Sequence, residues 1–249
     1  MKNKTISVEG LYKRYGNNHD YVFENFDLEI ETSSFYGLLG PNGCGKTTLI
    51  SIINGLLSAE KGKISINGYE LKRNFNKIKP LIGLVPQEVA LYSHLSFLEN
   101  LRYFGSLYGL DKDQLKKQIA SCLYIAKLEK FKDILVCNYS GGMKRRANLA
   151  LSLIHKPKIL FLDEPSVNVD AQSRNMIFEI LRDLNQQGVT IFYTTHYLEE
   201  AQELCNDVAI MDNGEIIARG TPSELIASYP QAKNLGDVFL ELTGRYLRD

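Results

Sequence analysis

The stretch Gly40-Pro41-Asn42-Gly43-Cys44-Gly45-Lys46-Thr47 matches G-x-x-x-x-G-K-[ST], the pattern of a phosphate-binding loop, and Thr48 adds a further hydroxyl. The apolar run Phe35–Leu39 precedes it as a buried strand, and apolar residues at helical spacing follow it. Glycines let successive backbone N–H groups point at an anion, and the next helix adds partial positive charge at its N-terminus. This context predicts a nucleoside triphosphate site rather than a glycine-rich surface turn. Lys46 is expected to reach the β- and γ-phosphates, and Thr47 to ligate Mg²⁺.

Composition favours one α/β domain and does not favour a nucleic-acid partner. The chain has 249 residues, with 29 basic and 29 acidic side chains, so its formal net charge is zero. This length accommodates one buried α/β core with an inserted lobe. A zero net charge offers no basic excess for wrapping a nucleic acid, so no nucleic-acid partner is expected.

The sequence offers neither a membrane span nor a pattern of paired cysteines. No run of about 18 apolar residues occurs, and the N-terminal segment lacks the apolar core of a signal peptide. If the protein serves a membrane process, we expect another polypeptide to supply the membrane part. Free thiols in a reducing cytosol are expected for all four cysteines, Cys44, Cys122, Cys137 and Cys205. Alkylation of Cys44, within the loop, is expected to block nucleotide binding, and ATP to prevent it.

Strand patterns dominate the first part of the chain and helix patterns the middle. Short apolar or alternating runs predict strands over 5–11, 21–30, Phe35–Leu39, 63–67 and Ile82–Val85. Amphipathic spacing then predicts helices over 97–109, 112–127 and 141–155. This change predicts a helical lobe inserted into a sheet domain.

Strand patterns return after the helical lobe. Apolar strands are predicted over 159–162 and 189–194, joined by a helix over 174–187, which is a βαβ unit with parallel strands. The turn Asn213-Gly214 predicts a hairpin between 208–211 and 215–218. Thr221, Pro222 and Glu224 then have the positions of cap, first residue and third residue of a short helix.

Two carboxylates follow the predicted strand over 159–162. In an open α/β sheet, ligands bind at the carboxyl ends of the strands, beside the phosphate loop. Asp163 is therefore a candidate to hold Mg²⁺. Glu164 is a candidate to accept a proton from the attacking water. Acidic residues also follow strands as ordinary caps, but the phosphate loop favours the catalytic interpretation.

A histidine and a glutamine also stand at strand ends. His196 follows the strand over 189–194, and beside a γ-phosphate its imidazole can donate a hydrogen bond to developing charge. Alone, it would be interpreted as a half-exposed loop histidine. Gln87 stands at the boundary between the predicted sheet domain and the helical lobe, and its amide can reach Mg²⁺ or water there.

Ser140-Gly141-Gly142 opens the predicted helix over 141–155 and forms a second candidate anion site. A hydroxyl, free N–H groups and the positive end of the helix dipole coincide there. One phosphate loop is already present, so a second site has no use in a lone monomer. It fits a chain that closes over a nucleotide held by a partner subunit.

Taken together and in this order, these segments resemble the nucleotide-binding subunit of an ABC transporter. The resemblance extends from about Ile6 to Leu242. It implies a P-loop NTPase sheet core with an antiparallel β subdomain and an inserted α-helical subdomain, an α/β fold. Within a single domain spanning 1–249, the core is expected over 1–87 and 156–225, the helical subdomain over 88–155 and a C-terminal helix over 226–249.

The resemblance also implies an ATPase that works as a head-to-tail dimer enclosing two ATP molecules with Mg²⁺. Each site would combine the Lys46 loop of one subunit with Ser140, Gly141 and Gly142 of the other. By the same resemblance, Tyr15 stacks on adenine and Asp170 bonds across the dimer. A homodimer at the cytoplasmic face of the membrane is expected, attached to a separate polytopic permease.

Three segments are similar to the drug, antibiotic and polysaccharide exporter branch of this family: 91–110, 142–146 and 235–245. Tyr139, Asn168 and Ala171 depart from the usual Leu, Gly and Pro. Asn tolerates positive φ best among non-glycine residues, so we expect the turn at Asn168 to survive. Tyr139 is expected to change only a packing side chain, so both sites of a homodimer should hydrolyse ATP.

Two other functions remain as alternatives. One is a soluble ABC-type ATPase without a membrane partner, of the iron–sulfur assembly type. The other is a nucleotide sensor that binds without hydrolysis, which conflicts with Glu164 and His196. Fold resemblance alone does not separate these functions.

Overall fold

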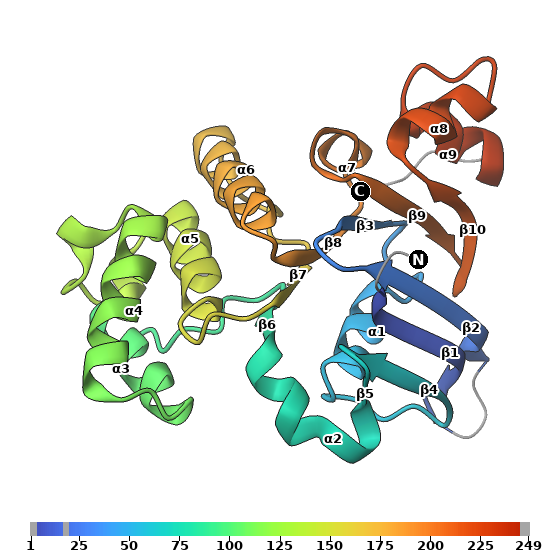
Figure 1. Cartoon of the computed structure of the whole chain (residues 1–249). Coiled ribbons are helices and arrows are strands. Elements are labelled where there is room, and N and C mark those ends of the chain that lie inside the picture. The colour runs from blue at the N-terminus through green and yellow to red at the C-terminus, as the bar shows by residue number, and fades with distance from the viewer. Residues whose placement is uncertain (1–3, 17–19, 245–249) are drawn as a thin grey trace.

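Two sheets and the helices around them make up the computed structural model, which describes residues 4–16 and 20–244 (Figure 1). One sheet is antiparallel, in the order β2-β1-β4-β5, and the other has six strands, in the order β10-β9-β3-β8-β7-β6. A group of helices lies at the far side of the six-stranded sheet from the antiparallel sheet (Figure 1). The predicted α/β class, with an antiparallel part and an inserted helical part, is confirmed.

The antiparallel sheet uses alternating side chains. Val8 pairs with Leu28 on one side and with Ile64 on the other, and all three side chains are buried. Alternation of buried and exposed residues is typical of a sheet with one face on the core. Its strands are β1 Lys4–Arg14, β2 Tyr21–Glu31, β4 Lys61–Ile66 and β5 Tyr69–Glu70.

The six-stranded sheet carries the functional residues at its strand ends. Neighbouring strands from β9 to β6 pair in parallel, and β10 pairs antiparallel with β9, so the predicted hairpin and parallel βαβ unit are confirmed. Every residue of β3, β7 and β8 is buried, as continuous apolar runs predict for a sheet covered on both faces. The strands are β3 Phe35–Leu39, β6 Ile82–Val85, β7 Ile159–Asp163, β8 Thr190–Thr195, β9 Asp207–Asp212 and β10 Glu215–Gly220.

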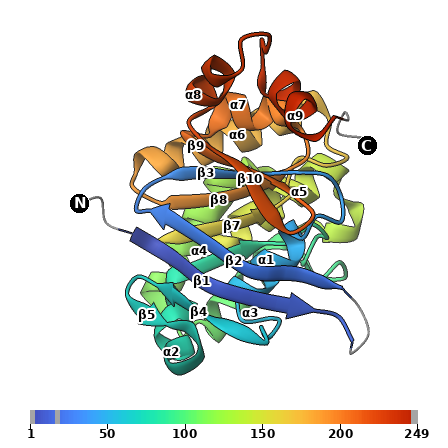
Figure 2. The same ribbon diagram turned by 90° about the vertical axis from the view of Figure 1, so that its right-hand side faces the viewer.

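Helix α1, Lys46–Ile53, packs between the two sheets. Its Leu49 and Ile53 share one core with Val8 of the antiparallel sheet and with Phe161 and Phe192 of the six-stranded sheet. A second core covers the opposite face of the six-stranded sheet, where four helices lie (Figure 2). These helices are α6 Ala171–Gln186, α7 Leu198–Leu204, α8 Pro222–Ser228 and α9 Leu235–Thr243. The capping box predicted at Thr221 is present at the start of α8.

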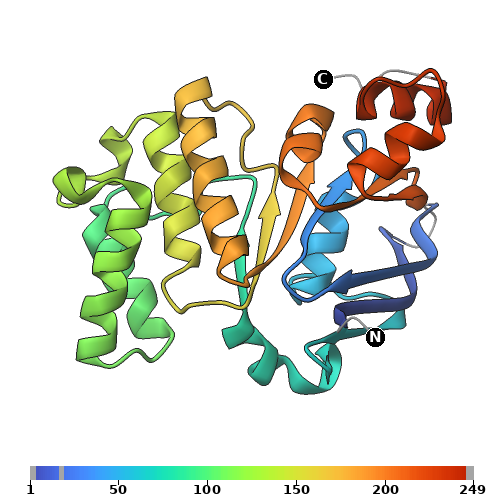
Figure 3. The ribbon, with the colours of Figure 1, turned by 45° about the horizontal axis from the view of Figure 1, so that its top comes forward.

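The middle of the chain forms a helical lobe with its own core, built around Phe97 and Leu128 (Figure 3). Capping boxes at Ser96 and Asp111 begin its first two helices. Tyr139 lies in this core, and its hydroxyl donates to the carbonyl of Phe131 at 2.7 Å. The lobe's helices are α3 Phe97–Leu107, α4 Lys112–Ala126 and α5 Gly141–Ser152.

Several local features differ from the sequence-based expectations. Helix α6 begins three residues earlier than predicted, because the Asp170 side chain accepts the Ser173 N–H at 2.9 Å and caps the helix. Helix α5 ends at Ser152 rather than at 155. Two helices were not predicted, α7 and α2 Leu71–Ile78. Across the described ranges, none of the helices combines the length and the apolar character that a membrane span requires. Residues 245–249 of the predicted C-terminal segment lie outside the described residues.

Candidate functional site

The phosphate loop connects β3 to α1 and depends on glycines with positive φ. Gly43 has φ 83° and Gly45 has φ 116°. A Cβ added at Gly45 would lie 2.9 Å from the side chains of both Met211 and Phe23. The loop therefore packs tightly on the core at Gly45, while a Cβ at Gly43 would meet nothing within 4 Å.

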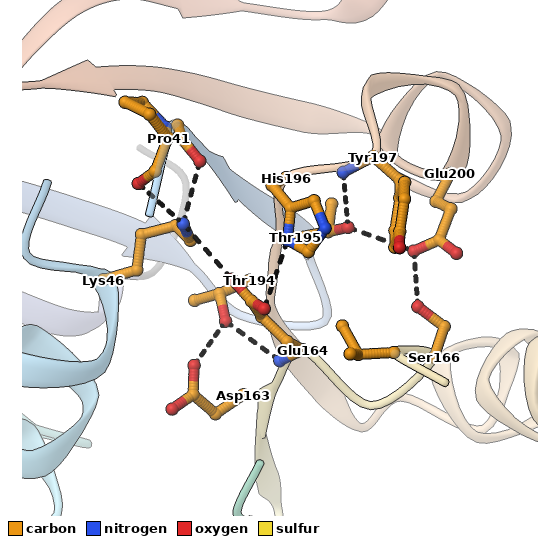
Figure 4. A network of polar contacts seen from close by, with 12 residues as sticks. Pro41, Lys46, Asp163, Glu164, Ser166, Thr194, Thr195, His196, Tyr197 and Glu200 are labelled. Carbon is orange, nitrogen blue, oxygen red and sulfur yellow. Dashed lines mark hydrogen bonds and ion pairs between the residues drawn. The ribbon is translucent and has the colours of Figure 1, made fainter. Parts of the chain in front are cut away.

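Lys46 is the first residue of α1, and its side chain is buried. Figure 4 shows its polar contacts. Its ammonium donates to the carbonyls of Gly40 and Pro41, at 2.8 and 3.1 Å. The same Nζ lies 3.3 Å from Oε1 of Glu164. The loop thus holds its lysine beside the carboxylate that follows β7.

Glu164 is buried and has a left-handed backbone, with φ 48°. Its N–H donates to the Thr194 hydroxyl at 3.2 Å, which ties the end of β7 to β8. Nδ1 of His196 lies 3.1 Å from Oε2 of Glu164, at ion-pair distance but without aligned hydrogen-bond geometry. Left-handed residues other than glycine cluster at functional sites. Glu164 therefore stands between a lysine and a histidine at the carboxyl end of the sheet.

Asp163 directly precedes Glu164 and is the last residue of β7. Its Oδ1 accepts the Thr194 hydroxyl at 2.8 Å. Burial raises the pKa of this carboxyl above its ordinary value, and hydrogen bonds from Thr194 and Thr47 partly oppose the rise. The Thr47 hydroxyl and the Asp163 carboxylate thus meet, and the buried carboxylate would gain from a cation beside it. These oxygen ligands are the type that Mg²⁺ prefers.

An open cavity of about 560 Å³ lies over the loop. Tyr15 lines it, and its hydroxyl is 3.1 Å from that of Thr48. The residues around the cavity are Tyr15, Val22, Asn42, Gly43, Gly45, Lys46, Thr47, Thr48, Gln87 and Glu164. Within the described residues no three His, Cys, Asp or Glu side chains cluster as for a metal, so a cation here would rely on one carboxylate with hydroxyl and amide oxygens.

Ser140, Gly141, Gly142 and Asp170 do not line this cavity. The Ser140 side chain accepts the Met143 N–H at 3.2 Å and caps α5. Gly142 is buried, and a Cβ there would lie 1.9 Å from the Ser173 hydroxyl of α6. A Cβ at Gly141 would meet nothing, and Ser140, Gly141 and Asp170 are exposed. Within one chain, Gly142 therefore serves helix packing, while Gly141 faces solvent.

Cys44 contributes its backbone, not its thiol, to the loop surface. The side chain is buried, and its Sγ would lie 2.8 Å from a Cβ added at Gly40. It belongs to the core between the two sheets. Burial raises the pKa of the thiol, although Lys46 nearby acts in the opposite direction. The expectation of an accessible, reactive thiol at this position is therefore wrong.

The sequence-based interpretation missed two polar links around the site. Arg145 of α5 donates to the carbonyls of Gln87 and Val167. Glu200 of α7 is buried and accepts hydroxyl hydrogens from segments next to Glu164 and His196. The spacing of Leu198, Ala201 and Leu204 was the available signal for α7, and through it for Glu200.

Comparison with known proteins agrees with this geometry. Residues 23–167 match the family model described as ABC transporter. The linearmycin resistance ATP-binding protein LnrL of Bacillus subtilis is 41% identical over 239 residues, which cover 96% of this chain and 74% of that protein. The daunorubicin resistance ATP-binding protein DrrA3 of Streptomyces coeruleorubidus is 37% identical, covering 91% and 71%.

Solved structures of ATP-binding proteins have the same fold. An ATP-binding subunit of an ABC transporter superimposes with a TM-score of 0.85 at 27% identity, covering 96% of this chain and 99% of that one. A dimeric post-hydrolysis state of an ATP-binding cassette, bound to ADP and Pi, gives a TM-score of 0.79 at 25% identity, covering 87% and 98%. The phosphate loop, the carboxylates after β7 and the histidine after β8 thus occur in a chain whose sequence and fold both match one family. The chain belongs to the ABC transporter family of ATP-binding proteins.

Proposed function

We propose that this chain is the ATP-hydrolysing subunit of an exporter and works as a homodimer at the cytoplasmic face of a membrane, with a separate polytopic permease. The names of its relatives support export: two are resistance ATP-binding proteins, and a third, from Cupriavidus metallidurans, is a Nod factor export ATP-binding protein. The soluble iron–sulfur assembly alternative is not favoured by these names. The convergence of Lys46, Glu164 and His196 at one sheet edge carries the proposal.

ATP binding is assigned to the cavity over the loop. Lys46 and the backbone of 40–48 bind the phosphates, through the N–H group that each of these residues except Pro41 carries, and Tyr15 stacks on adenine at the cavity. Thr47, Gln87 and Asp163 would hold Mg²⁺, which would neutralise the charge that develops on the phosphates. The raised pKa of buried Asp163 supports this assignment, since a carboxylate so placed gains most from a nearby cation.

Hydrolysis is assigned to the residues after β7 and β8. Glu164 orients the attacking water and accepts its proton, and His196 donates a hydrogen bond to the γ-phosphate. Lys46 pairs with Glu164 in the chain described here. A phosphate that draws the Lys46 ammonium toward itself would leave the Glu164 carboxylate free to accept a proton. ATP binding would then also free Glu164 to act as the base.

The dimer is assigned to the exposed surface at the starts of α5 and α6. Ser140, Gly141 and Asp170 reach a nucleotide held by a second copy of the chain, and Gly142 lets α5 pack closely on α6 beside them. ATP closes the dimer and hydrolysis opens it, as nucleotide switches do. The helical subdomain 88–155 and Gln87 pass this motion from the core, 1–87 and 156–225, to the permease. The remaining segment, 226–249, is the proposed C-terminal helix.

The test is ATP turnover as a function of protein concentration. We expect specific activity to rise with concentration, and Gly141→Ala to lose most of it without loss of stability. Ser140→Ala should lose activity too, although it also removes a helix cap worth about 1 kcal/mol, so its melting temperature must be measured. Ser106→Ala is the control, since Ser106 is an exposed helix serine away from the cavity. Concentration-independent turnover by a monomer, unaffected at 140 and 141, would refute the dimer.

The membrane partner needs its own experiment. The tagged chain is expressed in its own organism, and detergent extracts of the membranes are purified through the tag. Co-purification of a polytopic protein supports the exporter. A chain that hydrolyses ATP but is recovered from these extracts without any polytopic protein would favour the soluble alternative.

A further inference from the structure

Glu200 is a buried carboxylate that holds three hydroxyl groups. It lies on α7 and is 4% exposed. Its Oε2 accepts from the hydroxyls of Ser166 at 2.8 Å, Tyr193 at 2.8 Å and Thr195 at 3.1 Å. No Lys, Arg or His of the described ranges forms an ion pair with it. A carboxylate that is buried without a cation depends on such hydrogen bonds, so all three donors are fixed in place.

The three donors come from the two segments that carry the proposed catalytic residues. Ser166 is two residues after Glu164, and Thr195 directly precedes His196. The Thr195 hydroxyl also accepts the Tyr197 N–H at 2.9 Å, so the backbone is held on both sides of His196. Figure 4 shows this second network beside the Lys46–Glu164–His196 contacts. Through Ser166 and Thr195, Glu200 therefore joins the chain segments that follow Asp163 and Thr194, the last residue pair between β7 and β8.

Tyr193 strengthens this link from within the sheet. Its ring is fully buried in β8, and only its hydroxyl reaches Glu200. Burial raises the pKa of Tyr193, with the Glu200 charge adding to the rise, so the phenol stays protonated and remains a donor. Exposed glutamates on the same helix have no such role: Glu203 pairs with Arg182 at the surface.

We propose that Glu200 is a positioning residue for ATP hydrolysis, which holds Glu164 and His196 at their mutual distance through Ser166 and Thr195. This inference rests on the proposed function. Glu200 would act on hydrolysis without contacting ATP, since it does not line the cavity over the loop. Displacements of about 1 Å at a reacting group can lower a rate by up to about 100-fold, so such a link has a measurable kinetic effect.

The experiment compares steady-state ATP hydrolysis, nucleotide affinity and thermal unfolding for the wild type and six variants of the full chain. Glu200→Ala should lower kcat by about tenfold or more while KM for ATP changes by less than about twofold, since the phosphate loop is untouched. Glu200→Gln should recover most of kcat, because its amide oxygen still accepts hydroxyl hydrogens. Tyr193→Phe should lower kcat less than Glu200→Ala does. Glu203→Ala is the control and should leave both constants unchanged.

Opposite results would overturn the inference. If Glu200→Ala keeps the wild-type kcat at a temperature where it is folded, or if its loss of activity only follows its folded fraction, Glu200 is a structural residue. If Glu200→Ala does not fold, Tyr193→Phe and Ser166→Ala decide, and unchanged kcat in both overturns the inference. Glu164→Gln is measured in parallel. Turnover by that variant at the wild-type rate would instead refute the proposed catalytic role of Glu164.

Discussion

Nζ of Lys46 lies 3.3 Å from Oε1 of Glu164, and both side chains are buried. The cation assigned to the phosphates and the carboxylate assigned to the water are thus each other's partner. A buried charge that loses its partner is strongly disfavoured. Nucleotide phosphates must therefore replace Glu164 as the partner of Lys46, and the two roles are coupled through one contact.

Glu164→Gln tests this coupling. We expect turnover to fall by about 100-fold or more, because the amide cannot accept a proton. ATP binding should be retained or become tighter, since Lys46 no longer has a competing carboxylate. Size-exclusion chromatography with ATP should show an accumulated dimer. Glu199→Gln, at an exposed position of α7, is the control. Wild-type turnover by Glu164→Gln would show that another group accepts the proton.

Local patterns predicted the parts of the fold that depend on neighbouring residues. The strand before the loop, the hairpin at Asn213-Gly214 and the cap at Thr221 are set by turn chemistry and periodicity, and all three are confirmed. Asn168 has φ 59°, as expected from its tolerance of the left-handed region. The strand ends that carry Asp163, Glu164 and His196 were predicted for the same reason.

Features that depend on distant residues were not accessible from the sequence. The contact between Gly142 and Ser173 depends on how α5 packs against α6. The direction of the Cys44 thiol depends on the core beneath the loop. Glu200 acquires its partners only because β7 and β8 are neighbours in the sheet. No periodicity encodes such pairings, because each joins segments far apart in the chain.

Asp163→Asn should stabilise the nucleotide-free protein at neutral pH. Folding raises the pKa of Asp163, so its ionised form favours the unfolded state, and wild-type stability falls as pH rises through the folded pKa. Asn keeps the acceptor for Thr194 without the charge. We expect a melting temperature about 2–4 °C higher near pH 7, and a gain that vanishes below about pH 4. Calorimetry with a chelator would measure it.

The same variant should lose Mg²⁺-dependent ATP hydrolysis, which separates it from a general stabilising change. Thr194→Val is the comparison, since it removes the hydroxyl that donates to Asp163 and leaves the Asp163 carboxylate buried. That variant should be less stable at neutral pH. A destabilised Asp163→Asn near pH 7 would mean that the ionised carboxylate favours the fold.

Gly142→Ala should destabilise the chain by about 1–3 kcal/mol, because the added methyl overlaps the Ser173 side chain and must push α5 from α6. Gly141→Ala is the matched control and should leave stability unchanged, since nothing lies within 4 Å of its Cβ. Ser173→Gly removes the obstacle, so the penalty at 142 should shrink in that background. Urea unfolding of the wild type, Gly142→Ala, Ser173→Gly, the double variant and the Gly141→Ala control measures this, and equal penalties in both backgrounds would contradict the contact.

Alkylation should distinguish Cys44 from Cys137. Cys44 is buried and its thiol pKa is raised, so at any pH below that pKa it has less thiolate than an ordinary cysteine. Cys137 is exposed. We expect Cys137 to react about tenfold faster or more in the folded protein. Cys137→Ser should be nearly inert, because Cys122 and Cys205 are buried too, and burial raises the pKa of Cys122 to about 12. Adding ATP should change none of these rates, whereas fast labelling of Cys44 that ATP prevents would show that the loop opens to expose its thiol.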